Sequence, residues 1–179
     1  MKVVIVYLIK GEMQKYQKRL IKKTANLSGE RYLAYDNSLP EHITLKIPFR
    51  IKNFKKLENL LSEFASNQKR YPVKVRKFGN FRKFVAFLKT DFSRGAKKVQ
   101  KNLVKTLYKE YRLSSQDHDI NWNPHATLVY GNTPESFKII WRYLKSLEKP
   151  KFDFEFDNIT ILKKPKRLWK VHKVFKIPK

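Results

Sequence analysis

The tetrapeptide His-x-Thr-Leu occurs twice in this chain, at residues 42–45 and again at residues 125–128. The two copies differ in residue number by a fixed offset (125 − 42 = 83) and contain two of the four histidines in the sequence. Side chains alternate between the two faces of an extended strand, so His and Thr of each copy are expected on one face and the apolar residues on the other. The repeat therefore predicts two strands of one design, each of which presents an imidazole beside a hydroxyl.

The segments around the two copies also follow a common pattern. Apolar residues at helical spacing predict four helices, near residues 13–27, 54–64, 96–111 and 137–147. Asn53, Ser93 and Thr133 are suitable N-caps for the last three. Turns are expected at residues 79–80 and 163–166. Runs rich in β-branched and aromatic residues predict strands at residues 2–9, 42–51, 71–78, 83–90, 125–130, 152–162 and 168–177.

A shift by the same offset places the helix that follows His42 on the helix that follows His125, and the helix near Glu12 close to Gly95. We therefore expect an α+β fold of two pseudo-symmetric lobes, each an antiparallel sheet with flanking helices. A central cleft between the lobes is expected to carry both His-x-Thr motifs. No Gly/Ser-rich linker separates the halves, so residues 1–179 are expected to form a single bilobal domain with an internal duplication.

Charge and composition limit the partners of this chain. Lysine and arginine number 41 against 15 acidic residues, which gives a formal net charge of +26 and favours RNA or DNA as partner. A solvated, lysine-rich surface explains the same charge without a partner. The absence of cysteine excludes disulfides and thiolate metal sites. No apolar run approaches the roughly 20 residues of a membrane span, and residues 3–9 are expected as a first strand rather than a signal peptide. We expect a cytoplasmic monomer that binds no membrane.

The residues around the two motifs resemble those of the 2H phosphoesterase superfamily, which includes 2′-5′ RNA ligase proteins and RNA 2′,3′-cyclic phosphodiesterases. Residues 40–49 (PEHITLKIPF) resemble its first motif, residues 123–128 (NPHATL) its second, and residues 154–162 with 169–171 its closing strand pair. The resemblance implies a bilobal α+β fold, a groove lined by both motifs, and metal-free chemistry on RNA phosphodiesters. The first motif continues as IPFR where many relatives carry glycine, so the resemblance does not specify a substrate.

These residue types suit chemistry on a cyclic phosphodiester. Its hydrolysis needs a base for water, an acid for the departing ribose oxygen, and donors to the non-bridging oxygens. Two histidines with ordinary pKa values of about 6.5 can share the first two tasks at neutral pH. We expect His125 to activate water and His42 to protonate the leaving oxygen, while Thr44 and Thr127 donate hydrogen bonds to the phosphate. This chemistry needs no metal, and no cofactor is expected.

Three further residues are candidates for substrate binding. Lys46 lies two residues beyond Thr44 and is expected on the face of His42, where its ammonium would bind phosphate. A solvent-facing lysine at the end of the strand is the competing interpretation. Phe49 and Tyr130 are candidates to stack on a base, with core packing as the simpler role for each.

Other polar features receive no catalytic role. The run Asp117-His118-Asp119 is expected in a solvated loop, and His172 lacks a threonine two residues after it. Basic residues between positions 74 and 83 alternate with phenylalanines, which fits either a guide for RNA or a charged hairpin with a buried aromatic face.

The sequence as a whole predicts a metal-independent phosphoesterase that opens RNA 2′,3′-cyclic phosphate ends to 2′-phosphomonoesters and whose groove could also carry out reversible 2′-5′ RNA ligation. Two alternatives stay open. One is a basic RNA-binding module without significant catalysis. The other is an enzyme of the same superfamily that cleaves 2′-5′ oligonucleotides or trims RNA ends.

Overall fold

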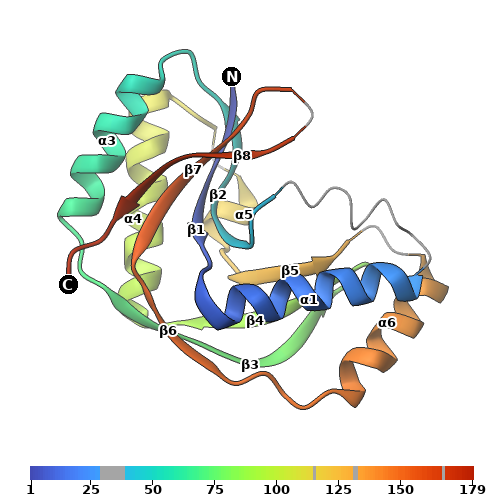
Figure 1. Ribbon diagram of the computed structural model, residues 1–179. Helices are drawn as coiled ribbons and strands as arrows, with labels where there is room; N and C mark the ends of the chain where they lie inside the picture. The colour runs from blue at the N-terminus through green and yellow to red at the C-terminus, as the bar shows by residue number, and fades with distance from the viewer. Residues whose placement is uncertain (29–38, 115, 131–132, 167) are drawn as a thin grey trace.

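The computed structural model describes residues 1–28, 39–114, 116–130, 133–166 and 168–179 (Figure 1). Within these residues the chain forms five helices and eight strands. The helices are α1 (Gly11–Ser28), α3 (Phe54–Ser66), α4 (Arg94–Tyr111), α5 (Asp117–Ile120) and α6 (Pro134–Ser146). The strands are β1 (Lys2–Leu8), β2 (His42–Arg50), β3 (Tyr71–Phe81), β4 (Val85–Phe92), β5 (His125–Val129), β6 (Phe152–Phe156), β7 (Asn158–Lys164) and β8 (Lys170–Lys176).

Two four-stranded antiparallel sheets form the scaffold, with strand orders β2-β1-β7-β8 and β5-β4-β3-β6. The predicted α+β fold of antiparallel sheets with flanking helices is confirmed. The strands that begin with His42 and His125, β2 and β5, are edge strands of their sheets and contact each other. The two His-x-Thr motifs therefore lie at the junction between the sheets.

The two longest helices cross between the halves of the chain. α1 follows β1 in sequence but contacts β5 and α6, whereas α4 follows β4 and contacts β2 as well as its own sheet. Figure 1 shows α3 and α4 on one flank of the molecule and α1 and α6 on the other. Shifting the bounds of α1 by the offset between the two histidines gives the bounds of α4. Equivalent positions of the two helices can therefore be compared directly.

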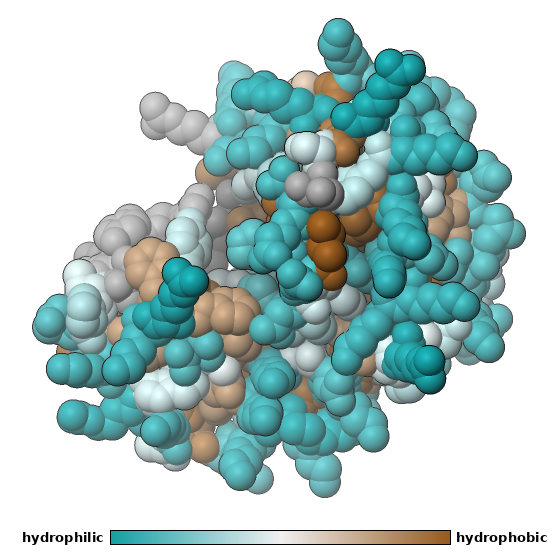
Figure 2. All heavy atoms as spheres, turned by 180° about the vertical axis from the view of Figure 1, so that it is seen from behind, coloured by the Kyte–Doolittle hydropathy of each residue, from teal (hydrophilic) through white to brown (hydrophobic). Residues whose placement is uncertain are grey.

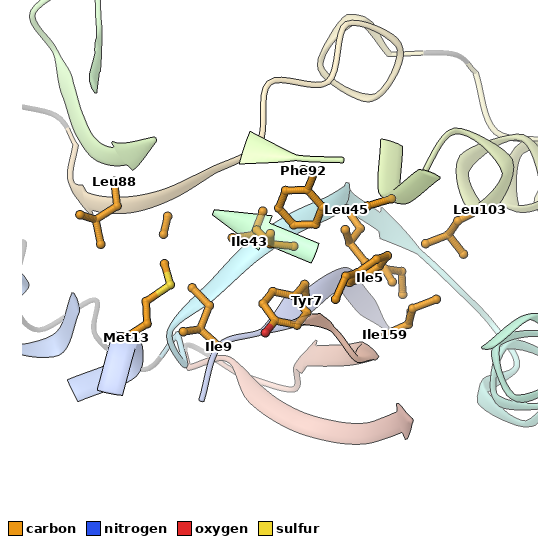
Figure 3. Close-up of a cluster of buried hydrophobic side chains, with 14 of the residues drawn as sticks. Ile5, Tyr7, Ile9, Met13, Ile43, Leu45, Leu88, Phe92, Leu103 and Ile159 are labelled. Atoms are coloured by element: carbon orange, nitrogen blue, oxygen red, sulfur yellow. The ribbon is translucent and has the colours of Figure 1, made fainter. Parts of the chain in front are cut away.

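One hydrophobic core joins both sheets (Figure 3). Ile5 and Ile43 come from the first sheet, Leu88 and Phe92 from the second, and Leu103 from α4, and each is at most 1% exposed. Burying a large apolar side chain of this kind contributes about 1.5–3 kcal/mol. Because both sheets contribute to the same cluster, separating them would expose core residues of each.

The segment 152–162, predicted as one strand, is two strands in different sheets. β6 pairs with β3, β7 pairs with β1, and Asp157 lies between them. The side-chain amide of Asn158 fixes the crossing, because it accepts from the Leu8 amide and donates to the Leu8 carbonyl, both at 3.0 Å. β-forming residues continue on both sides of the break, so the sequence pattern does not mark it.

The turn predicted at residues 79–80 lies instead at residues 82–84, where the first two residues have φ angles of 46° and 55°. Gly79 is inside β3, opposite Phe87 of β4. A Cβ at this position would overlap the Phe87 ring. This glycine therefore permits a close approach between strands rather than a reversal of the chain.

Hydrophilic side chains dominate the surface, as the net charge requires. They cover most of the face shown in Figure 2, where hydrophobic residues are visible only in small separate patches. Among the helices that the structure describes, none has the length and apolar character needed to span a membrane.

Candidate active site

The two motifs lie at the junction of β2 and β5 and line two adjoining cavities, which together we call the active-site groove. In both copies the His and Thr side chains are partly buried and the residue after each of them is buried, as the alternation predicts. A cavity of about 550 Å³ is lined by Thr44, His125 and Thr127, and a smaller one of about 70 Å³ by His42 and Thr127. Thr127 and Tyr130 line both cavities, so the two adjoin each other.

Backbone carbonyls orient the two imidazoles in the same way. His42 Nδ1 lies 2.6 Å from the carbonyl oxygen of Pro40, and His125 Nδ1 lies 2.7 Å from that of Asn123. In each copy the carbonyl belongs to the residue two positions before the histidine. A carbonyl oxygen only accepts, so Nδ1 of each ring carries its hydrogen and donates it. Nε2 is then the nitrogen that can take up or deliver a proton in both rings.

Burial lowers the pKa of both histidines from the ordinary value. For His42, the hydrogen bond to Pro40 and the negative charge of Glu41 oppose the decrease in pKa, whereas the charge of His125 adds to it. For His125, the backbone hydrogen bond opposes the decrease and the charge of His118 adds to it. The charge of His125 thus makes protonation of His42 less favourable, in addition to the larger effect of burial.

The threonine hydroxyls are positioned by their backbones. Within the described residues, neither Thr44 Oγ1 nor Thr127 Oγ1 has a hydrogen-bond partner. The carbonyl of Thr44 accepts from Trp122 Nε1 at 2.7 Å, and that of Thr127 accepts from Gln17 Nε2 at 3.0 Å. Both hydroxyls therefore line the groove on a fixed backbone and can donate to a bound oxyanion.

Two glutamines at equivalent positions of α1 and α4 brace the motifs reciprocally. Gln17 holds the carbonyl of Thr127, and Gln100 donates from Nε2 to the carbonyl of Leu45 at 2.9 Å. Both glutamines are buried, and they are separated by the same offset as the histidines. A helix from each half of the chain thus hydrogen-bonds to the His-x-Thr motif of the other half. Aligning the sequence with itself at this shift would have matched the two glutamines, but a single identity carries little weight without the structure.

Phe81 and Phe87 pack against the ring of His125. Their ring centroids lie 4.9 Å and 5.0 Å from that of the imidazole, and Phe81 meets it edge-on. The two phenylalanines also contact each other at 4.4 Å. Gly79 leaves room for Phe87, so the β3–β4 hairpin is shaped to support His125. The sequence pattern identified Phe81 only as an aromatic residue within a basic segment.

Lys46 departs from the alternation that predicted its position. β2 has one extra residue at Leu45, because Thr44 pairs with Val6 of β1 while Lys46 pairs with the adjacent Ile5. The bulge turns Lys46 inward, where it is 2% exposed. It lines neither cavity of the groove and is not solvent-facing either. Its position gives no support to the predicted phosphate contact.

Asp119 is the centre of a buried polar cluster, and the prediction of a solvated loop at residues 117–119 is wrong for this residue. Its Oδ2 lies 2.9 Å from Lys46 Nζ and accepts from the Tyr108 hydroxyl at 3.0 Å. Its Oδ1 accepts from the backbone amide of Ile47 at 2.9 Å. The residues after α5 lead directly into the second motif. The cluster therefore ties the position of the first motif to that of the second.

The remaining sequence candidates are divided between groove and core. Tyr130 is 44% exposed and lines the groove, whereas Phe49 is 8% exposed and packs against Tyr111 with ring centroids 6.0 Å apart. His172 lies away from the groove and contacts Glu58 of α3 at 2.8 Å. Among the residues that the structure describes, no three His, Asp or Glu side chains are grouped to hold a metal ion.

His118 is a residue of the site that the sequence analysis missed. It lies on α5 and lines the larger cavity together with Asn121 and Asn123. Its charge acts on His125 and lowers the pKa of that ring. Nothing in its local sequence marks this role, because it depends on the short helix that folds back beside the second motif.

A family model described as the 2′-5′ RNA ligase superfamily matches residues 11–167 of this chain. The chain belongs to this superfamily of 2H phosphoesterases. The resemblance carried by the two His-x-Thr motifs is thereby confirmed. A comparison with curated protein sequences gives no match.

Crystal structures of several other proteins have a similar fold. The TT0787 protein of Thermus thermophilus is similar with a TM-score of 0.65 and 15% sequence identity, over 99% of this chain and 98% of that one. E. coli LigT in complex with NADP+ has a TM-score of 0.60 and 14% identity, again over 99% and 98% of the two chains. At these identities the likeness shows the fold alone.

The buried ion pair of this 2H phosphoesterase can be tested by its effect on stability. We predict that Asp119→Ala lowers the free energy of unfolding by about 3–5 kcal/mol, because it leaves the Lys46 ammonium buried without a partner. Urea denaturation measures the change. The matched control is Lys46→Met/Asp119→Leu, which removes both charges and is expected to recover part of the loss. An Asp119→Ala protein as stable as the parent would contradict the proposed burial of charge.

The influence of His118 on His125 can be measured without any substrate. Replacing His118 with Gln removes a positive charge that disfavours protonation of His125, so the pKa of His125 is expected to rise toward its ordinary value. An NMR titration of the histidine rings reports this shift. His172→Gln is the matched control and should leave the pKa of His125 unchanged. An unchanged pKa in His118→Gln would show that the two rings do not interact.

Proposed function

We propose that this protein hydrolyses 2′,3′-cyclic phosphate ends of RNA to 2′-phosphomonoesters, with His42 and His125 as an acid–base pair that needs no metal ion. The observation that carries the proposal is the matched orientation of the two rings. Each donates Nδ1–H to a carbonyl two residues earlier, which leaves Nε2 of both rings for proton transfer at one groove. Two such rings from opposite halves can act on the two sides of a single phosphorus atom.

Burial lowers the pKa of both rings, and their charged neighbours differ. The charge of His118 adds to the decrease for His125, which suits a base, whereas the Glu41 carboxylate partly opposes the decrease to which burial and His125 contribute for His42, which suits an acid. In the proposed reaction, Nε2 of His125 takes a proton from water as its oxygen bonds to phosphorus. The bond from phosphorus to the 3′-oxygen breaks, and that oxygen receives the proton from Nε2–H of His42.

Hydroxyl groups are proposed to stabilise the phosphate during this step. Thr44 and Thr127 line the larger cavity together with His125. Their hydroxyls can donate to the non-bridging oxygens as negative charge builds up, which is commonly a large contribution to catalysis. With a 5′-hydroxyl in place of water, the same proton transfers would join the 2′,3′-cyclic end to that hydroxyl and form a 2′-5′ linkage, with the 3′-oxygen again leaving as a hydroxyl.

Two observations support RNA as the substrate. The net charge of +26 favours a polyanion. The chain also belongs to a superfamily named for 2′-5′ RNA ligation. E. coli LigT, a similar fold, has been crystallised with 3′-AMP and with phosphate. We infer that Tyr130, which is exposed in the groove, contacts the base or ribose of the terminal nucleotide.

A direct assay tests the proposal. Purified protein with EDTA is expected to open a cyclic-phosphate-ended oligonucleotide, and mass spectrometry should identify a 2′-phosphomonoester. His42→Ala and His125→Ala are each expected to lower kcat by about 10²–10⁴-fold, because each removes one proton-transfer group. His172→Ala is the control and should retain full activity. No turnover by the parent protein would favour an RNA-binding module without catalysis, and cleavage of a 2′-5′ linkage instead would indicate the other superfamily activity.

The pH dependence should report both rings. Activity falls at low pH when the base is protonated and at high pH when the acid loses its proton, so kcat/KM should follow a bell-shaped profile. Burial lowers the pKa of both histidines in the unliganded protein, which places the maximum below about pH 6.5. The maximum of kcat should lie at higher pH than the maximum of kcat/KM, because a bound phosphate anion raises the pKa of the histidines by favouring the charged imidazolium. A kcat/KM that still increases above neutral pH would assign the acid to another group.

A further inference from the structure

A second cavity adjoins the proposed active site. It has a volume of about 470 Å³, lies between α4 and α5, and shares Asp119 and Trp122 with the cavity that contains His125. Trp122 also donates to the carbonyl of Thr44, so one wall of this second cavity is fixed to the first motif. A ligand in the groove could therefore continue into the second cavity along the surface of α5. We call this cavity the α4 groove.

Lysines border the α4 groove at every turn of α4. Lys97, Lys101 and Lys105 all line it, are all exposed, and are spaced four residues apart, about 6 Å along the helix axis. Lys97 lies 3.8 Å from Asp91, in an exposed pair that holds the ammonium only weakly. Within the described residues, Lys101 and Lys105 have no carboxylate within 4 Å. Their charges are therefore available to a ligand.

Apolar surface lies between these lysines, beside the polar residues Gln100 and Asp119, whose side chains are already engaged by the Leu45 carbonyl and by Lys46 and Tyr108. Val104 and Trp122 line the α4 groove, and Ile120 stands at its edge with 62% of its surface exposed. A row of ammonium groups beside an aromatic side chain, here Trp122, is the combination that binds single-stranded nucleic acid, and the exposed Ile120 extends the apolar surface next to it. Phosphates bind the lysines, while bases or ribose lie on the apolar surface.

Two other cavities also combine basic and apolar residues but are not joined to the active-site groove. One between α1 and α6 is lined by Arg19, Lys149 and Lys151 as well as Glu148, and it shares no residue with that groove. Another lies beside the β7–β8 connection at Lys166 and Leu168, again with no shared residue. Position relative to the site, and not charge alone, distinguishes the α4 groove.

We propose that the α4 groove binds the single-stranded RNA on the 5′ side of the cyclic phosphate end. This inference rests on the proposed function, since it extends the substrate from its reacting terminus. A 2′,3′-cyclic phosphate occupies both ribose oxygens of the last nucleotide, so the rest of the RNA leaves the site only in the 5′ direction. Lys101 and Lys105 contact its phosphates, and Ile120 and Trp122 contact a base. The groove therefore makes the enzyme selective for RNA strands over short cyclic nucleotides.

The test compares two variants with the same loss of charge. Lys101→Gln/Lys105→Gln alters the α4 groove, and Lys18→Gln/Lys22→Gln alters the equivalent turns of α1, which line no cavity that the structure describes. Fluorescence anisotropy measures binding of an RNA of about 12 nucleotides that ends in a 2′-phosphomonoester. The groove variant is expected to bind it about tenfold more weakly, with a salt slope smaller by about 1.4, equal to two phosphate contacts. The α1 variant should keep the parental slope.

Kinetics provide the second arm. The groove variant should show a higher KM for the 12-nucleotide cyclic-phosphate substrate, with unchanged kcat/KM for a dinucleotide that ends at the same cyclic phosphate. If the groove variant and the α1 variant lost the same affinity for the RNA, the effect would be explained by net charge alone. If kcat/KM of the groove variant fell as much for the dinucleotide as for the 12-nucleotide substrate, the lysines would act at the reacting end. Either result overturns the proposal. Absence of hydrolysis by the parent protein would reject the proposed function alone, because the binding arm requires no catalysis.

Discussion

The buried contact between Lys46 and Asp119 is the interaction that fixes one half of the site against the other. A salt bridge excluded from water is not by itself a source of stability, since the cost of desolvation is comparable to the attraction. Its main effect is to fix the relative positions of the elements that it joins. Asp119 also accepts from the amide of Ile47 and the hydroxyl of Tyr108, so its carboxylate tolerates only one arrangement of β2, α4 and α5. The chain that leaves α5 then carries His125 to a defined position relative to His42.

The two halves are interlocked rather than placed side by side. α1 packs on β5 and α4 packs on β2, and each of the two helices contributes one glutamine that holds a backbone carbonyl in the opposite motif. A displacement of one sheet against the other would break both hydrogen bonds and open the common core. Catalysis by a pair of histidines requires the distance between them to be constant. The reciprocal packing provides that constancy without a ligand that bridges the halves.

Sequence periodicity was sufficient for the sheets, the long helices and the two His-x-Thr faces, because these depend on regular alternation and spacing. It failed where the backbone departs from regularity. A bulge at Leu45 reversed the expected direction of Lys46, and the crossing at Asp157 separated two strands that read as one. Contacts between distant segments were equally hidden. Nothing near His118 or Phe87 in the sequence indicates that they face His125, since only the folding of α5 and of the β3–β4 hairpin brings them there.

The positive surface charge favours binding of an anionic substrate, whereas burial of the site disfavours protonation of its histidines. A net charge of +26 favours a polyanion such as RNA, whereas burial and the charge of a neighbouring histidine disfavour a proton on His42 and His125. In the proposed complex the phosphate would oppose the second effect, because its negative charge would lie beside both rings and favour one imidazolium. The acid form that the proposed reaction requires would then be populated most fully with substrate bound. Electrostatic attraction would thus couple RNA binding to that protonation state.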